Sequence, residues 1–440
     1  MNMKLRNIPF SPPDMTEAEA KEVREAILSG WITTGPRTKK LEQQISEYVH
    51  TDKTVCLNSA TAALEMVLHL LDIQPDDEVI VPAYTYTATA SVTQHVGCKL
   101  VLVDSQKDSV EMDYDKLAAA ITEKTKVIAP VDLGGIVADY DRVFEIVEAK
   151  KGLFKPNNAL QAKIGRIVVS ADCAHSFGAS RKGQMAGGIA DFSSFSFNAV
   201  KNFTTAEGGA LTWHLPFGNE PVLVKGSGLM VQGFNYLPNV PKKEGETWNE
   251  LLYRLSQLFS LHGQNKDALA KTKLGAWEYD IIGPWYKCNM TDIMAALGLV
   301  QMERYKGILE RRYEIVNRYN KAIDDLNANL DANHKVAYLN HRDSEHCSSH
   351  HLYLVRLQGR TREDANRVIE QMAERGIACN VHYKPLPMMT AYKSLGFDIK
   401  NYPNAYNLFV NEVSLPLHTK LTDEDIEYVT SNFVEIVRSL

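Results

Sequence analysis

Two patterns of hydrophobic and polar positions alternate along this chain, short apolar runs and stretches with the helical period. Together they predict alternating strands and helices. Short apolar runs of strand length occur at residues 54–57, 78–81, 99–104, 126–131, 164–170, 192–197 and 209–213. Patterns with the helical period cover residues 16–29, 38–48, 61–71, 87–96 and 293–325. Strands that alternate with helices predict an α/β fold with a mainly parallel sheet, covered by helices on both faces.

The C-terminal part of the chain has a different order of elements. Residues 351–382 predict a strand, a helix and a second strand. Residues 422–437 predict an amphipathic closing helix with three acidic residues in its first turn, where they suit the helix dipole. We therefore expect a smaller α+β domain at this end of the chain.

The length of the chain supports a division into two domains. A chain of 440 residues is too long for one ordinary hydrophobic core. We expect a large domain over residues 1–305 and a small C-terminal domain over 306–440, with the helix predicted at 293–325 linking them. Residues 215–260 are rich in Gly, Pro and Lys and predict an irregular excursion on the surface or a loop that meets another subunit.

Composition narrows the class of protein. Apolar residues make up 45% and charged residues 23%, the net charge is -6 and the pI is about 6.1, which is ordinary for a soluble enzyme and poor for nucleic-acid binding. The six cysteines form no CxxC pair and predict reduced thiols. The apolar runs are strand-sized, too short for a membrane helix, and the N-terminal segment has no apolar core of signal-peptide length. We expect a cytoplasmic enzyme without nucleic-acid or membrane partners.

Candidate chemistry begins at the segment LNSATAALEMVL, where a strand end meets small residues and a helix start. Backbone N–H groups at such a point bind anions, and Ala60, Thr61 and Ala62 are candidates to hold a phosphate. The alternative is a capped helix of the core. A second feature, VPAYTYTATA, places Tyr84 and Tyr86 after a strand, where a ring can stack on a planar ligand or simply pack in the core.

Asp172 ends an apolar strand in VVSADCAHSFGA. A carboxylate there is costly unless it is paired, and a protonated pyridine nitrogen would be a suitable partner. The alternative is a residue that caps the following turn. His175 lies three residues on and either bonds a cofactor oxygen or has a structural role.

Lys201 lies in SFSFNAVKNFTTAEGGAL among apolar and small residues. Removal from water would lower its pKa and make it a good imine-forming amine. Ser196 comes five residues earlier and is a candidate to donate a hydrogen bond to a phosphate. The alternative is a surface lysine in a turn. The order of these features along the chain favours a site, because all of them follow strands whose carboxyl ends meet at one edge of the predicted sheet.

Together these segments resemble the DegT/DnrJ/StrS family of sugar aminotransferases, whose fold is the type I PLP-dependent transferase (aspartate-aminotransferase-like) fold and whose cofactor is pyridoxal 5'-phosphate (PLP). The resemblance spans nearly the whole chain. The motifs that carry it are IPFSPPDMTEAE, GWITTGP, NSATAAL, DEVIVPAYTYTATA, ADCAHSFGA, SFSFNAVKNFTTAEGGAL, YKCNMTDIMAALGLVQMER, GIACNVHYKPL and VSLPLHTKLTDEDIEYV.

The resemblance implies roles around the cofactor ring. Lys201 would be the catalytic lysine that holds PLP as an imine. Asp172 would pair with the pyridine nitrogen, Tyr86 would stack on the ring, and His175 would lie near the cofactor hydroxyl. Lys201 also separates the chain from one branch of the family, which has His at this position and acts as a dehydratase.

The resemblance also implies a phosphate site shared between two subunits. Ala60, Thr61 and Ser196 would contact the phosphate from one subunit. Lys287 or Asn289, in YKCNMTDI, would reach it from the other across a homodimer interface. The sequence departs from the family here, since Ala60 replaces a commoner Gly, and many members have Asn and Arg in place of Lys287 and Asn289.

The implied activity is transfer of an amino group from L-glutamate to a nucleotide-linked keto-sugar, with PLP and pyridoxamine phosphate (PMP) as the two cofactor forms. A 4-keto-6-deoxyhexose is the expected sugar, and surface-polysaccharide or glycoconjugate biosynthesis is the expected setting. Two alternatives stay open, a PLP-dependent sugar dehydratase and a non-catalytic protein that binds or senses PLP. Residues 151–161 and the stretch near 216–246 look like insertions relative to the family.

Two other cofactor classes are disfavoured. No GxGxxG opens a predicted helix, so a nicotinamide enzyme is not expected. The stretch HCSSHH at residues 346–351 is histidine-rich, but its spacing on a strand entry favours a structural role over a metal site.

Overall fold

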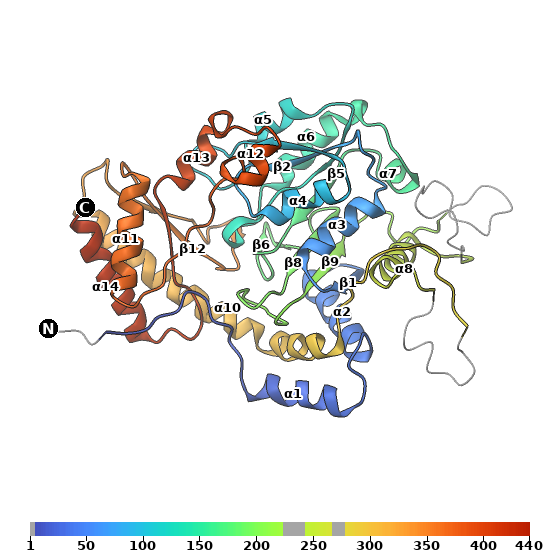
Figure 1. Cartoon of the computed structure of the whole chain (residues 1–440), viewed down its shortest axis with the longest axis horizontal. Coiled ribbons are helices and arrows are strands. Elements are labelled where there is room, and N and C mark those ends of the chain that lie inside the picture. The colour runs from blue at the N-terminus through green and yellow to red at the C-terminus, as the bar shows by residue number, and fades with distance from the viewer. Residues whose placement is uncertain (1–4, 223–242, 266–277) are drawn as a thin grey trace.

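The computed structural model describes residues 5–222, 243–265 and 278–440 and is built around one large sheet (Figure 1). In spatial order the strands are β1 (Lys53–Leu57), β9 (Gly209–Trp213), β8 (Phe192–Ser196), β5 (Val168–Asp172), β4 (Thr125–Ile128), β2 (Glu78–Pro82) and β3 (Lys99–Val103). Strand β9 is antiparallel to both of its neighbours, and the remaining pairs are parallel. The predicted α/β class with a mainly parallel sheet is confirmed.

Both faces of this sheet are buried, which explains why its strands read as continuous apolar runs. Successive side chains of a strand point to opposite faces. Thus Val79 and Val81 join one hydrophobic cluster with α3 (Ala60–Leu70), α4 (Thr87–His95) and α8 (Trp248–Ser260). Ile80 joins the other, on the face covered by α2 (Pro36–Val49), α5 (Tyr114–Ala120) and α6 (Tyr140–Ala149).

The C-terminal part forms a third hydrophobic cluster around a small antiparallel sheet of β10 (Val336–Tyr338), β12 (Tyr353–Leu357) and β13 (Glu412–Leu415). Helices α11 (Arg362–Glu374) and α14 (Asp423–Arg438) pack on it at one end of the molecule (Figure 1). The long helix α10 (Asp292–Asn327) contacts α1 (Glu17–Leu28) and α2 as well as α14. The domain division at residue 305 stays a prediction.

Several shorter strands and α-helices lie between these elements. They are α7 (Ala159–Ile164), β6 (Ser180–Arg181), β7 (Gln184–Met185), β11 (His346–Cys347), α12 (Thr390–Ser394) and α13 (Pro403–Phe409). Within the described residues, no helix is both long and apolar enough to cross a membrane. All six cysteines are free.

Three local predictions were wrong. The strand expected at 164–170 begins only at Val168, because α7 ends at Ile164 and Gly165 follows it in the left-handed conformation. Part of the expected irregular excursion at 215–260 is helix α8, which a capping box of Thr247 and Glu250 starts and an apolar face buries. The second strand expected within 351–382 is reduced to isolated bridges to Ile8 and Ser414. Residues 223–242 of the excursion lie outside the described residues.

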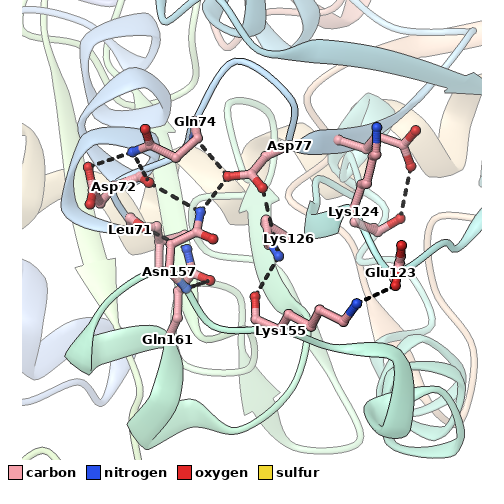
Figure 2. Close-up of polar contacts among 12 residues, drawn as sticks. Leu71, Asp72, Gln74, Asp77, Glu123, Lys124, Lys126, Lys155, Asn157 and Gln161 are labelled. Carbon is pink, nitrogen blue, oxygen red and sulfur yellow. Dashed lines mark hydrogen bonds and ion pairs between the residues drawn. The ribbon is translucent and has the colours of Figure 1, made fainter. Parts of the chain in front are cut away.

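The 151–161 segment is tied to the body of the protein by side-chain amides (Figure 2). Gln161 donates a 2.6 Å hydrogen bond to the carbonyl of Leu71, and Asn157 bonds to Asp72 and Asp77. The carbonyl of Lys155 accepts from Lys126, whose ammonium also lies 3.7 Å from Asp77. The segment therefore provides hydrogen-bond donors for the backbone carbonyls of Leu71 and Asp72, which follow the C-terminal end of α3. Helix α3 begins at Ala60, the first of the residues proposed to hold a phosphate.

Candidate active site

A cavity of about 380 Å³ lies where the carboxyl ends of the parallel strands meet, which is the usual ligand site of such sheets. Seven of the residues singled out from the sequence line it together. They are Ala60, Thr61, Tyr86, Asp172, His175, Ser196 and Lys201.

Lys201 lies in the turn after β8, where its backbone N–H donates a 2.9 Å hydrogen bond to the carbonyl of Asn198. Burial lowers the pKa of Lys201 to about 8, although the negative charge of Asp172 opposes this shift. No ion pair to Lys201 occurs among the described residues. A lysine with a lowered pKa and no carboxylate bound to it keeps a useful fraction of neutral, nucleophilic amine near neutral pH.

Asp172 is the last residue of β5 and is only 5% exposed. Its carboxylate accepts hydrogen bonds from Thr89 Oγ1 at 2.6 Å and from the backbone N–H of Ala174 at 3.0 Å. Burial raises the pKa of Asp172, and these two bonds together with the charge of Lys201 oppose that rise. Within the described residues no cation forms an ion pair with it, so a buried carboxylate faces the cavity ready for a cationic ligand atom.

The start of α3 is a candidate anion site. Ser59 caps this helix by accepting from the backbone N–H of Ala62 at 3.1 Å, which leaves the N–H groups of Ala60 and Thr61 without a partner in the described chain. The side chain of Ser196 lines the same cavity. A Cβ added to Gly209 would lie 2.5 Å from the nitrogen of Ala60, so glycine is required for this close approach. Backbone donors at a helix N-terminus suit a phosphate.

His175 faces the cavity from the turn after β5. Its Nδ1 accepts a 3.2 Å hydrogen bond from the N–H of Gly134, so its hydrogen must lie on Nε2, which is 3.1 Å from the hydroxyl of Tyr383. Burial lowers the pKa of His175 well below its usual value, with the charge of Lys201 in the same direction. The imidazole is therefore neutral, and both of its nitrogens have protein partners.

Tyr86 presents an aromatic face at the cavity, with 58% of the residue exposed. Its backbone caps α4, and its ring lies 5.9 Å from the ring of Tyr383. Tyr84 instead has the ordinary core role, since it is 1% exposed.

Lys287 and Asn289 lie outside the cavity of their own chain. Their side chains bond to each other, and Asn289 Nδ2 donates to Thr34 Oγ1 at 2.5 Å. The segment nevertheless runs beside the chain that leads into α3, because the N–H of Asn58 donates to the carbonyl of Cys288 at 2.8 Å. A role toward the phosphate of a second subunit stays a prediction.

The sequence did not place several residues of this cavity in the site, and His351 was expected to have only a structural role. Phe10 and Ser11 enter from the N-terminal segment, and His351, His382 and Tyr383 enter from the C-terminal part. Tyr383 and His382 lie within GIACNVHYKPL, a motif that carried the family resemblance without an assigned function.

The arrangement fits a planar, phosphate-bearing ring. An aromatic face, a buried carboxylate and a helix N-terminus surround one lysine amine, and each offers the contact that one part of such a ring requires. Within the described residues no group of three His, Cys, Asp or Glu side chains is arranged to hold a metal ion.

Comparison with known proteins gives consistent matches along the chain. The sequence profile of the DegT/DnrJ/EryC1/StrS aminotransferase family matches residues 13–222 and 246–434. The spore coat polysaccharide biosynthesis protein SpsC of Bacillus subtilis is 31% identical over 437 residues, which is 98% of this chain and 97% of SpsC.

Solved structures of a sugar aminotransferase also match this chain. The PLP form of Spr1654 from Streptococcus pneumoniae, assigned as a sugar aminotransferase, is 51% identical with a TM-score of 0.86, and 99% of each chain is covered. The PMP form of that protein is 52% identical with a TM-score of 0.87, over 98% of this chain and 100% of the other. The matched regions include the segments that hold Asp172 and Lys201.

Proposed function

This chain belongs to the DegT/DnrJ/EryC1/StrS aminotransferase family, and from that premise we propose that it transfers the amino group of L-glutamate to a nucleotide-linked keto-sugar. The chain is a PLP-dependent sugar aminotransferase of the type I fold. The finer substrate assignment rests on the chemistry of the cavity and on the polysaccharide setting of SpsC. A 4-keto-6-deoxyhexose is the sugar that we propose.

The single observation that carries the proposal is that Lys201 and Asp172 line the same cavity. The first is a lysine whose pKa burial lowers to about 8, and the second is a buried carboxylate without a protein cation among the described residues. We propose that Asp172 holds the pyridine nitrogen of PLP, that Ala60, Thr61 and Ser196 hold its phosphate, and that Tyr86 covers its ring. When bound, PLP supplies an electron sink for the negative charge that develops on a reacting carbon.

Each of the remaining residues of the site has a separate proposed role. Lys201 anchors the cofactor and, once its amine is free, accepts a proton at Nζ and returns it to a neighbouring carbon, a task that its lowered pKa suits. Thr89 and the N–H of Ala174 orient the Asp172 carboxylate. His175 stays neutral, and its hydrogen bonds with Gly134 and Tyr383 fix the orientation of its imidazole. We propose that this imidazole lies beside the cofactor ring.

We further propose a homodimer in which Lys287 and Asn289 complete the phosphate site of the partner. The proposal is supported by the position of this segment, which borders the phosphate turn while its side chains lie outside the cavity of their own chain. A cytoplasmic location is proposed from the six free cysteines, which suit a reducing compartment.

Product analysis tests the proposal. The purified enzyme is incubated with PLP, L-glutamate and UDP-4-keto-6-deoxy-N-acetylglucosamine. We expect 2-oxoglutarate and an amino sugar in equal amounts. A sugar product that has lost water, formed without consumption of glutamate, would support a dehydratase instead.

A further inference from the structure

His382 lies beside strand β13 because the segment before it pairs with that strand. The backbone groups of Asn380 and Ser414 exchange hydrogen bonds of 3.0 and 2.8 Å, one in each direction. Antiparallel pairing then brings His382, two residues on, next to Glu412. Glu412 and Ser414 point to the same face of β13, since side chains alternate along a strand.

These three residues form a chain of hydrogen bonds. Glu412 Oε2 accepts from the backbone N–H of His382 at 3.0 Å, and Oε1 accepts from the hydroxyl of Ser414 at 2.5 Å. The oxygen of that hydroxyl lies 2.9 Å from Nδ1 of His382. Glu412 is 1% exposed and Ser414 is fully buried, so solvent does not compete for these contacts.

The chain has a fixed direction when Glu412 is ionised. A carboxylate only accepts hydrogen bonds, so Ser414 must give its single hydrogen to Glu412. The oxygen of Ser414 is then the acceptor for Nδ1, and the hydrogen of the imidazole must lie on Nδ1. His382 is thereby held in the tautomer whose Nε2 carries a lone pair.

Nε2 is the polar atom of His382 left for a ligand. The carbonyl of His382 accepts a 2.8 Å hydrogen bond from Tyr84, and its N–H and Nδ1 are bonded as described above. In the described part of the chain no group bonds to Nε2, while the residue lines the cavity that holds Lys201. Its ring stacks on Phe10 with centroids 5.4 Å apart, which fixes its plane.

We propose that His382 binds the sugar substrate, with Nε2 accepting a hydrogen bond from a sugar hydroxyl, and that Glu412 and Ser414 are positioning residues that impose the accepting tautomer. This inference rests on the proposed sugar aminotransferase function. A neutral imidazole lone pair attracts hydroxyl hydrogens and offers nothing to a carboxylate or a phosphate, which also only accept. The sugar part of the substrate carries hydroxyl groups, which can donate to Nε2, so we assign this part as its ligand.

The charges around the chain support a neutral imidazole. Burial lowers the pKa of His382 to about 4, and the positive charge of Lys201 acts in the same direction. Burial raises the pKa of Glu412 to about 7, against the hydrogen bonds from Ser414 and His382 and the charge of Arg362. The other titratable groups around Glu412 are Arg356 from β12, Tyr84 after β2, and Cys379 and Tyr383 from the segment before and after His382.

The substitution Glu412→Gln reverses the chain. The N–H of His382 still requires an acceptor, so the amide oxygen must face it and the amide NH₂ must face Ser414. Ser414 then accepts from the amide and donates to Nδ1, and the hydrogen of the imidazole moves to Nε2. The variant is nearly isosteric, yet it presents a donor to the sugar in place of an acceptor.

The tautomer is read directly by ¹⁵N NMR of the PLP-loaded enzyme labelled in its histidines, at about pH 8.5, where Glu412 is ionised. The signal of His382 is assigned by its loss in His382→Asn. We expect hydrogen on Nδ1 in the wild type and in the control Glu435→Gln, an exposed carboxylate of α14, and hydrogen on Nε2 in Glu412→Gln. The same tautomer in all three proteins would overturn the proposed chain.

Enzyme kinetics test whether the ligand of His382 is the sugar substrate. With UDP-4-keto-6-deoxy-N-acetylglucosamine we expect Glu412→Gln to raise KM for the sugar about tenfold, as for a mismatched buried hydrogen bond, and to leave the glutamate half-reaction within about twofold. Equal loss in both half-reactions would contradict a sugar-specific role, and Ser414→Ala provides the same comparison in a second variant. A wild type that reacts with glutamate and ignores this sugar would refute the proposed substrate, while the tautomer measurement would still decide the direction of the chain.

Discussion

Thr89 donates a 2.6 Å hydrogen bond to Oδ2 of Asp172, and both residues are buried, with 1% and 5% of their surfaces exposed. The contact joins the first turn of α4 to the end of β5, where Asp172 lines the cavity. A hydrogen bond donated to a carboxylate favours its ionised form. Thr89 therefore opposes the effect of burial on Asp172, the residue that we propose as partner of the cofactor nitrogen.

Replacing Thr89 by Val is expected to slow transamination without unfolding the protein. Val keeps the shape of Thr but donates nothing, so the pKa of Asp172 should rise further and the carboxylate should hold a protonated ring less well. A lost hydrogen bond to a charged group is worth about 1.5–3 kcal/mol, which corresponds to a loss of roughly ten- to a hundredfold in rate. Single-turnover kinetics with L-glutamate measure this loss.

Thr93→Val is the matched control for this experiment. Thr93 is buried in the same helix, but its hydroxyl bonds to the carbonyl of Ala90 rather than to Asp172. Equal rates in the Thr89 and Thr93 variants would mean that the hydroxyl of Thr89 does not support Asp172.

The lowered pKa of Lys201 predicts the pH dependence of cofactor loading. Only the neutral amine reacts with the aldehyde of PLP, so the loading rate of apo-enzyme should rise with pH and level off above about 8. An ordinary lysine has a pKa of about 10.4 and would give a rate that still climbs well above that point. Stopped-flow absorbance across this range distinguishes the two profiles, with Lys201→Ala as the blank.

The 151–161 segment is expected to matter for stability and to be neutral for chemistry. Gln161 is fully buried, and its amide bonds to the carbonyl of Leu71, so Gln161→Ala should leave that carbonyl unpaired at a cost of about 1–3 kcal/mol. Thermal unfolding measures this cost. The control Gln43→Ala removes an exposed amide that bonds to the exposed Glu47 and should leave the Tm unchanged. A Gln161 variant as stable as the control would show that the segment is not tied down by this contact.

Glu412 predicts a pH-dependent stability difference. Its folded-state pKa is about 7 against an ordinary value of 4.5, so its stabilising contribution is present below about 4.5 and lost as the pH rises through 7. Glu412→Gln lacks this dependence, and the wild type should lose on the order of 3 kcal/mol relative to the variant over that window. Paired Tm measurements across this range test the prediction, and a difference that does not vary with pH would contradict the raised pKa.

Local signals explain why most of the large sheet and its covering helices could be predicted from the sequence. Strand β9 has the predicted bounds, Gly209–Trp213, because its buried run ends sharply at polar and glycine residues. The placement of Asp172 and Lys201 in one cavity could be predicted because each lies at or just after the end of a strand, and the carboxyl ends of parallel strands meet at one edge of a sheet. Helix α8 was missed because the Gly- and Pro-rich residues before it masked its apolar face.

The far wall of the cavity could not be predicted in the same way. Tyr383 contacts His175 across 208 residues of sequence, and Phe10 reaches His382 from the other end of the chain. These contacts depend on how the C-terminal part packs against the large sheet, and no local pattern of residues records that packing. The pairing of Ser414 with His382 has the same origin, since it requires the register between β13 and an irregular segment.

The most direct test of the central claim is the visible absorption spectrum of the purified, PLP-loaded protein before and after addition of L-glutamate. We predict a yellow band that depends on Lys201 and that fades to the spectrum of the PMP form when glutamate is added. A yellow band that persists with glutamate and other amino acids would contradict the aminotransferase assignment, and a colourless protein would contradict the role of Lys201 itself.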